Sequence, residues 1–259
     1  MKYVVIGGTG RIGSKVVSRL RDQGHEVIAA APSTGVDILT GAGLDAAMTR
    51  ADCVIDLANS PSFEDEASMQ FFQTAGRNLI DAELRAGVRH HLALSVVGTE
   101  RLQAVGYFRA KSAQERMIRE SGIAYTIVHS TQFFEFLPGI IESAAEGKTV
   151  RLPSALIQPI ASEDVAEAVA RLAVRAPVNG IVEIAGPEPE AMSGLAQRFM
   201  RIVQDPREVI SDAHARYFGA ELENDTLVPA QAAWHGAMNF ERWLRQSEYA
   251  RYAPQAEAG

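Results

Sequence analysis

The chain is poor in cysteine, and this scarcity excludes some classes of protein. Cys53 is the single cysteine among 259 residues, which excludes an intramolecular disulfide framework and a cysteine-rich metal site. It lies in an apolar run with Val54 and Ile55, where a thiol packs as a small core residue. Such sparing use of cysteine favours a reducing compartment.

Long apolar runs and an excess of basic residues are missing as well. No apolar run approaches the ~20 residues that a membrane span needs, and no signal peptide with a cleavage site is evident, so we expect a soluble, cytoplasmic protein that does not associate with a membrane. Lys and Arg number 25 against 32 Asp and Glu, and the formal net charge is −7. No phosphate-binding basic stripe is evident, which disfavours nucleic acid as a partner.

Patterns typical of strands and helices alternate along the first 130 residues. The strand patterns are short apolar runs rich in β-branched residues, and the helix patterns repeat apolar residues with a 3.6-residue period. Strands are expected at 3–6, 27–31, 53–58, 91–97 and 124–129, and helices at 12–23, 69–86 and 108–120. This alternation predicts an α/β fold of the Rossmann type, with a doubly wound parallel sheet covered on both faces.

The pattern weakens after residue 133. Helices are expected at 133–146 and 163–174, the second capped by Ser162, and strands at 156–160 and 180–185. The rest is expected to be mostly helical with long irregular stretches, and the tail 254–259 to fray. We therefore expect one dinucleotide-binding domain over 1–259, in which 133–259 forms a smaller, mostly helical substrate-binding part.

The first predicted strand leads directly into Gly7-Gly8-Thr9-Gly10-Arg11-Ile12-Gly13, and a helix pattern follows at once. Gly7 permits a tight turn, Gly10 lets the backbone approach a pyrophosphate, and Gly13 lets the helix pack closely on the strand. Free backbone N–H groups and the helix dipole then bind the phosphates. The strand before and the helix after distinguish this loop from an ordinary turn. The loop, including Thr9, Arg11 and Ile12, therefore predicts a NAD(P) site.

The end of the second predicted strand bears on which dinucleotide is bound. An NAD site usually places Asp or Glu there, against the ribose 2′-OH, but this chain continues from Ala31-Pro32 into Ser33-Thr34. Ser33 and Thr34 can donate hydrogen bonds to a 2′-phosphate and Arg11 can add charge, which favours NADP(H). The arginine expected in an NADP site is missing too, so NAD(H) stays open.

Polar residues that end or follow the third and fourth predicted strands are the candidate chemistry. Ala58 and Asn59 are expected beside the nicotinamide ribose, although a loop turn explains Asn59 equally well. Tyr107 and Lys111 are four apart and share one helix face, while Ser95 lies where ligands of open α/β sheets bind. A nearby ammonium lowers the pKa of a phenol, so Tyr107 could exchange a proton with a substrate oxygen that Ser95 also holds. A surface ion pair is the alternative.

Residues after the fifth predicted strand, and several in the last third, are candidates for the substrate pocket. Those after the strand are Gln132, Phe133 and Phe134, and those near the end are Trp234, His235, Phe240 and Trp243. Adjacent helix residues cannot face the same way, and tertiary packing explains the aromatic residues equally well. His90 and His91 point to opposite faces of a strand and have no third ligand, so no metal site is expected.

The phosphate loop, Ser95 and the Tyr107-x-x-x-Lys111 spacing resemble the short-chain dehydrogenase/reductase superfamily. Segments 130–136 and 159–166 are similar to its atypical branch, the NmrA-like NAD(P)-binding proteins. The resemblance implies a nicotinamide cofactor and, in many members, hydride transfer to a carbonyl or conjugated alkene. Ser95, Tyr107 and Lys111 match the family's catalytic residues in order. Asn78 is a loose match to the family's asparagine, and His129 stands where relatives often carry arginine.

These residues and the resemblance are compatible with three functions. The first is an NAD(P)H-dependent oxidoreductase that transfers hydride to or from a small organic carbonyl, quinone or enone, with Tyr107 as general acid/base and Lys111 lowering its pKa and contacting the nicotinamide ribose. The second is a non-catalytic regulator that senses the dinucleotide, although NmrA-like proteins of that kind tend to lack the tyrosine. The third is an isomerase or epimerase with a retained cofactor. Only the base rate of two-fold assemblies favours a homodimer.

Overall fold

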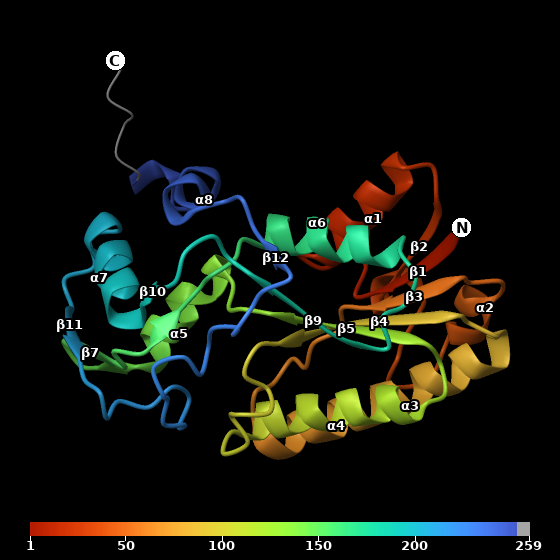
Figure 1. Ribbon diagram of the computed structural model, residues 1–259, viewed down its shortest axis with the longest axis horizontal. Coiled ribbons are helices and arrows are strands. Elements are labelled where there is room, and N and C mark those ends of the chain that lie inside the picture. Colours follow the sequence, from red (N-terminus) through yellow and green to blue (C-terminus); the bar gives the residue numbers. More distant parts are fainter. Residues whose placement is uncertain (253–259) are drawn as a thin grey trace.

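A seven-stranded parallel sheet forms the centre of the computed structural model, which describes residues 1–252 (Figure 1). Its order is β12-β9-β5-β4-β3-β1-β2. The strands are β1 (Lys2–Ile6), β2 (Glu26–Ala30), β3 (Cys53–Asp56), β4 (His90–Val96), β5 (Tyr125–Ser130), β9 (Gly180–Ala185) and β12 (Trp234–His235). The chain passes from β1 to β2 on one side and then to β3 on the other, so the topological switch point lies between β1 and β3. Ligands of open α/β sheets bind outside the carboxyl ends of the strands at that point.

Helices cover both faces of the sheet, as the alternating pattern predicts (Figure 1). One face carries α1 (Gly13–Asp22) and α6 (Ser162–Ala173), and the other carries α2 (Leu44–Met48), α3 (Asp65–Ala86) and α4 (Gly106–Glu120). Successive residues of β1 serve the two faces in turn, because side chains alternate along a strand. Tyr3 and Val5 pack in the core beneath α1 and α6, while Val4 and Ile6 pack with α2 and α3.

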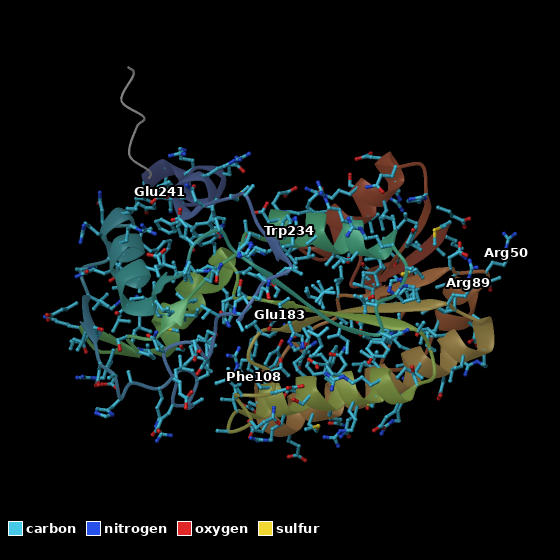
Figure 2. All side chains as sticks on the ribbon, viewed as in Figure 1. Arg50, Arg89, Phe108, Glu183, Trp234 and Glu241 are labelled. Atoms are coloured by element: carbon cyan, nitrogen blue, oxygen red, sulfur yellow. The ribbon has the colours of Figure 1, made fainter. Side chains whose placement is uncertain are left out.

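A second apolar core forms beyond the carboxyl-end edge of the sheet, at the left of Figure 1. Its elements are the 3₁₀ turn η2 (Phe134–Phe136), α5 (Leu137–Ser143), β6 (Ala145–Glu146), β7 (Thr149–Leu152), β8 (Leu156–Ile157), β10 (Glu190–Ala191), α7 (Met192–Ile202), β11 (Glu208–Ser211) and α8 (Phe240–Gln246). Phe108 of α4 joins this core, where the two parts of the molecule meet (Figure 2). Short 3₁₀ turns η1 (Pro32–Thr34) and η3 (Ala250–Tyr252) complete the described chain.

The sequence prediction is wrong in several places after residue 133. Phe133 is extended, and the predicted helix over 133–146 is divided into η2, α5 and the strand β6. Pro138 stands in the first turn of α5. Backbone N–H groups there have no partner within the helix, so a proline costs no hydrogen bond. The remainder is not mostly helical, because β7 pairs with β6 and β11, and β8 with β10. The predicted tail 254–259 lies outside the described residues.

The start of α6 also differs from the prediction. Ala161 is the N-cap residue, and Ser162 is already helical. The carboxylate of Glu135, on η2, accepts the Ser162 hydroxyl at 2.6 Å and the Ser162 backbone N–H at 3.2 Å. A carboxylate is stabilised at a helix N-terminus by the helix dipole and the free N–H groups. The cap therefore comes from another segment, which no local pattern identifies.

Candidate functional site

The phosphate loop has the geometry that a dinucleotide requires. Gly7 has φ +70°, and a Cβ on Gly13 would lie 2.1 Å from the Gly7 carbonyl oxygen, so helix α1 can start against the loop only at a glycine. Within residues 1–252, the backbone N–H groups of Arg11 and Ile12 have no hydrogen-bond partner. These free donors at the start of a helix fit a pyrophosphate.

Several sequence-predicted residues line one cavity of about 400 Å³. They come from the carboxyl ends of three neighbouring strands and from the first turn of α4: Asn59, Ser95, Tyr107, Gln132 and Phe133. Phe136, Tyr217 and Phe218 close the cavity from the C-terminal part. Phe134 does not line it. Its ring lies between Phe240 and Trp243, at centroid distances of 6.1 and 5.4 Å, so Phe134 belongs to the second core.

Tyr107 and Lys111 have different partners from those expected. The Tyr107 hydroxyl donates to Asn59 Oδ1 at 2.9 Å, and burial raises the pKa of the phenol above its ordinary value. Lys111 Nζ donates to the Leu94 carbonyl oxygen at 2.9 Å and to Gln114 Oε1 at 2.5 Å. The expectation that Lys111 lowers the pKa of Tyr107 is therefore wrong. Both side chains lie on one face of α4, but the Lys111 ammonium points to the Leu94 carbonyl oxygen of β4 and not to the phenol.

A buried network links Lys111 to the end of β3. Gln114 Nε2 donates to Asp56 Oδ2 at 2.8 Å, and Asp56 Oδ1 accepts the backbone N–H of Ala58 at 3.0 Å. This network ties α4 to the segment that carries Ala58 and Asn59. The sequence patterns did not single out Asp56, although a carboxylate at the end of an otherwise apolar strand was a visible signal.

The stability contribution of Lys111 should depend on pH. Burial lowers the pKa of Lys111 to about 8, whereas an unfolded lysine keeps its ordinary pKa of about 10.4. Between these values the unfolded chain binds more protons, so stability rises with pH. We expect wild type to gain up to about 3 kcal/mol over Lys111→Met as the pH rises from about 7.5 to about 10.5. Urea unfolding of both proteins across that range measures it, and a constant difference would contradict a lowered pKa.

Ser95 forms a second buried network, which the sequence did not reveal. Its hydroxyl lies 2.6 Å from Glu115 Oε1, and His129 Nε2 lies 2.8 Å from the same oxygen. Although burial acts to raise it, the hydrogen bonds from His129 and Ser95 hold the pKa of Glu115 below its ordinary value. An ionised carboxylate can only accept hydrogen bonds. The Ser95 hydroxyl therefore donates its hydrogen to Glu115 and has none to donate to a substrate oxygen. The available signal was Glu115 itself, four residues after Lys111.

The residues expected at the 2′-phosphate have different surroundings in the structure. Thr34 Oγ1 accepts the Ala31 N–H at 2.9 Å and lies 2.8 Å from the Ala29 carbonyl oxygen, so this hydroxyl closes the turn after β2. Arg11 lines a second cavity of about 530 Å³, with Trp243 and Tyr249 and without Ser33. The Thr34 hydroxyl is therefore engaged within the turn, while the contact of Ser33 and Arg11 with a 2′-phosphate stays a prediction.

Other candidates have structural contacts outside the cavity of about 400 Å³. Asn78 donates to the carbonyl oxygens of Ile38 and Leu39, so it does not match the family's asparagine. Trp234 and His235 form the edge strand β12, and Trp234 packs against the core beneath α6 (Figure 2).

The two adjacent histidines bind different partners. His90 bonds Thr126, and His91 bonds Glu83. Among residues 1–252, no three His, Cys, Asp or Glu side chains are grouped as a metal would require.

This chain spans about half the length of the curated relatives that it matches. A photosystem II assembly factor from Synechocystis sp. is 26% identical over 153 residues, which are 54% of this chain and 47% of that protein. Divinyl chlorophyllide a 8-vinyl-reductase from Cucumis sativus is 26% identical over 222 residues, which are 71% of this chain and 52% of that protein. In the part of the chain that the structure describes, no helix is long and apolar enough to cross a membrane.

Solved structures share the fold at low identity. UDP-glucose 4-epimerase from Thermus thermophilus, in complex with NAD, has a TM-score of 0.64 at 19% identity, covering 82% of this chain and 86% of that one. An NADPH-dependent quinone oxidoreductase from Escherichia coli has a TM-score of 0.61 at 18% identity, covering 82% and 78%. The family model described as NAD(P)H-binding matches residues 7–175, which include the phosphate loop, Ser95, Tyr107 and Lys111. The solved structures share the predicted fold, the family model confirms the predicted NAD(P)-binding family, and the chain belongs to the NAD(P)H-binding family.

Proposed function

We propose that the protein is an NAD(P)H-dependent oxidoreductase that reduces a small organic carbonyl, quinone or enone. One observation carries the proposal: the half-buried phenol of Tyr107 faces a cavity of about 400 Å³ at the carboxyl ends of the strands. The phosphate loop follows β1 at the same edge of the sheet. A proton donor, a cavity and a dinucleotide site at one sheet edge are the parts that hydride transfer to a carbonyl requires.

The chain's own residues hold and deliver the proton. When bound, the nicotinamide supplies the hydride. Addition of hydride to a carbonyl carbon leaves negative charge on the oxygen, and the Tyr107 hydroxyl gives its proton to that oxygen. Before transfer the Tyr107 hydroxyl donates to the amide oxygen of Asn59. This neutral acceptor holds the hydrogen less strongly than a carboxylate does, so the hydroxyl can exchange it for the substrate oxygen. Ser95, whose hydrogen is engaged by Glu115, offers the cavity only lone pairs and is suited to accept from a donor on the ligand.

The pKa of Tyr107 favours reduction over epimerisation. Burial raises this pKa, so the phenol is protonated at neutral pH and can act as an acid. An epimerase that first oxidises a hydroxyl needs the tyrosine as a base. Among residues 1–252, no lysine or arginine lines the cavity to stabilise a phenolate or to bind a sugar nucleotide's phosphates. A regulator that only senses the dinucleotide needs neither a substrate cavity nor a proton donor that faces it.

We further propose NADPH as the preferred nucleotide. The support is the missing carboxylate at the end of β2, where the chain continues through Ala31-Pro32-Ser33, because an acid there would repel a 2′-phosphate. The Thr34 hydroxyl is engaged in the turn after β2, and the arginine expected in an NADP site is missing, so the expected selectivity over NADH is modest.

Nucleotide titration followed by turnover tests both proposals. Purified protein is titrated with NADPH and with NADH, following nicotinamide fluorescence, and then screened against quinones, aldehydes and enones for oxidation of the reduced nucleotide. We expect tighter binding of NADPH and turnover with at least one acceptor. Nucleotide binding without turnover of any acceptor would favour the regulator, and a tightly copurifying cofactor without net oxidation would favour the epimerase.

A further inference from the structure

A tight hairpin turn at the cavity places a phenylalanine in a backbone conformation that it rarely adopts. Tyr217 and Ala220 exchange two backbone hydrogen bonds, of 2.8 and 3.0 Å. The two residues between them, Phe218 and Gly219, have φ values of +47° and +90°. Two-residue hairpin turns with positive φ at both positions strongly favour Asn, Asp or Gly. Phe218 is therefore unfavourable for the turn itself, and strain of this kind is concentrated at functional sites.

The ring of Phe218 belongs to an aromatic wall formed by Phe63, Phe136 and Phe218, all of which line the cavity. Phe218 stacks on Phe136, with centroids 5.8 Å apart and planes 21° apart. Phe136 lies against Phe63 at 6.1 Å, and Phe63 lies against Tyr107 at 5.1 Å. Phe63 is 50% exposed and Phe218 37%. The wall thus runs from solvent to the proton donor and keeps open aromatic surface that the protein does not cover.

The cavity has little charge to offer a ligand. Among the described residues that line it, Asp65 is the only Asp, Glu, Lys, Arg or His. Arg109 forms an ion pair with Asp65. In the described part of the chain, no lysine or arginine lines the cavity, so a phosphate or carboxylate would find no cation there. Exposed aromatic faces attract other rings through offset stacking and edge-to-face contacts.

We propose that the cavity binds an uncharged, planar conjugated ring, and that Phe218 selects this ring by stacking as part of the aromatic wall. The inference rests on the proposed function in taking the cavity as the substrate end of the site. A saturated ring presents hydrogens on both faces and cannot stack in this way. The strained turn holds the aromatic side chain where a residue better suited to the turn would leave an opening.

Replacing Phe218 by asparagine changes both the turn and the ring, and two measurements separate the two effects. Asparagine tolerates positive φ and lacks the ring, so we expect the melting temperature to rise by about 2–4 °C as the strain is relieved. The affinity for menadione, a planar uncharged quinone, should fall about two- to tenfold, the scale of one aromatic contact. Equilibrium dialysis without nucleotide measures this binding independently of turnover.

The matched variants are Phe218→Tyr, which retains a ring, and Leu84→Asn, which removes an exposed apolar side chain of α3 (53% exposed) outside the cavity. We expect both to bind menadione, and wild type to bind the saturated ketone trans-decalone far more weakly. Equal menadione affinity in Phe218→Asn and wild type, or equal affinity of wild type for both ketones, would overturn the proposal. Weaker menadione binding in Phe218→Asn than in wild type and Phe218→Tyr supports the proposal even if no acceptor is ever reduced. The absence of reduction would contradict only the proposed function.

Discussion

Replacing Tyr107 by phenylalanine should lower kcat for a responsive acceptor about 10²- to 10⁴-fold, the usual contribution of a positioned general acid. Phenylalanine keeps the ring contacts with Phe63 and Phe72, so NADPH affinity should change little. Steady-state kinetics and nucleotide titration measure the two effects separately. Tyr125→Phe, on β5 and outside the cavity, is the matched control. Turnover within about threefold of wild type in Tyr107→Phe would mean that the proton has another source.

The pH dependence of the wild type distinguishes a neutral phenol from an activated one. Because burial raises the pKa of Tyr107, the proton donor stays protonated through the neutral and mildly alkaline range. We expect no loss of kcat from this group up to about pH 10, the ordinary pKa of a phenol. A fall of kcat above neutral pH that disappears in Tyr107→Phe would instead indicate a lowered pKa.

Replacing His91 by leucine should destabilise the fold by about 3–5 kcal/mol, because it leaves a buried carboxylate without its partner. His91 Nδ1 lies 2.8 and 2.9 Å from the two carboxylate oxygens of Glu83, and both residues are buried between α3 and β4. Replacing both residues by leucine should recover most of the loss. The double variant also removes His91 Nε2, a buried atom without a partner in the described chain.

The stability of this pair also has a pH signature. Although burial acts to lower it, the charge of Glu83 raises the pKa of His91 above its ordinary value. A raised folded-state pKa means that the folded protein binds the extra proton, so the contribution is full below the ordinary pKa and is lost as the pH rises through the raised one. Wild type should therefore lose stability relative to the double leucine variant as the pH rises above about 6.5. Chemical denaturation of the wild type and of the single and double variants completes the cycle, and a double variant as unstable as His91→Leu would contradict the ion-pair account.

The fold of the first 130 residues and the place of the site could be predicted because both depend on local patterns. Apolar β-branched runs become buried parallel strands wherever helices cover both faces, and the glycines of the phosphate loop are required by backbone geometry alone. Carboxyl ends of parallel strands meet at one edge, so Asn59, Ser95 and Gln132 had to come close together once the strands were assigned. Pro138 was a local signal too, and it marks the start of α5.

What only the tertiary structure decided is the partner of each side chain. Spacing put Tyr107 and Lys111 on one helix face, but contact with the Leu94 carbonyl determined where the ammonium points. The hydrogen of Ser95 goes to Glu115, and the ring of Phe218 reaches the cavity from a turn 111 residues after Tyr107. Periodicity specifies a face, whereas the nearest atom depends on segments that are distant in the chain and meet only when the core packs. Burial, and with it the pKa of each group, follows from that packing and from no local pattern.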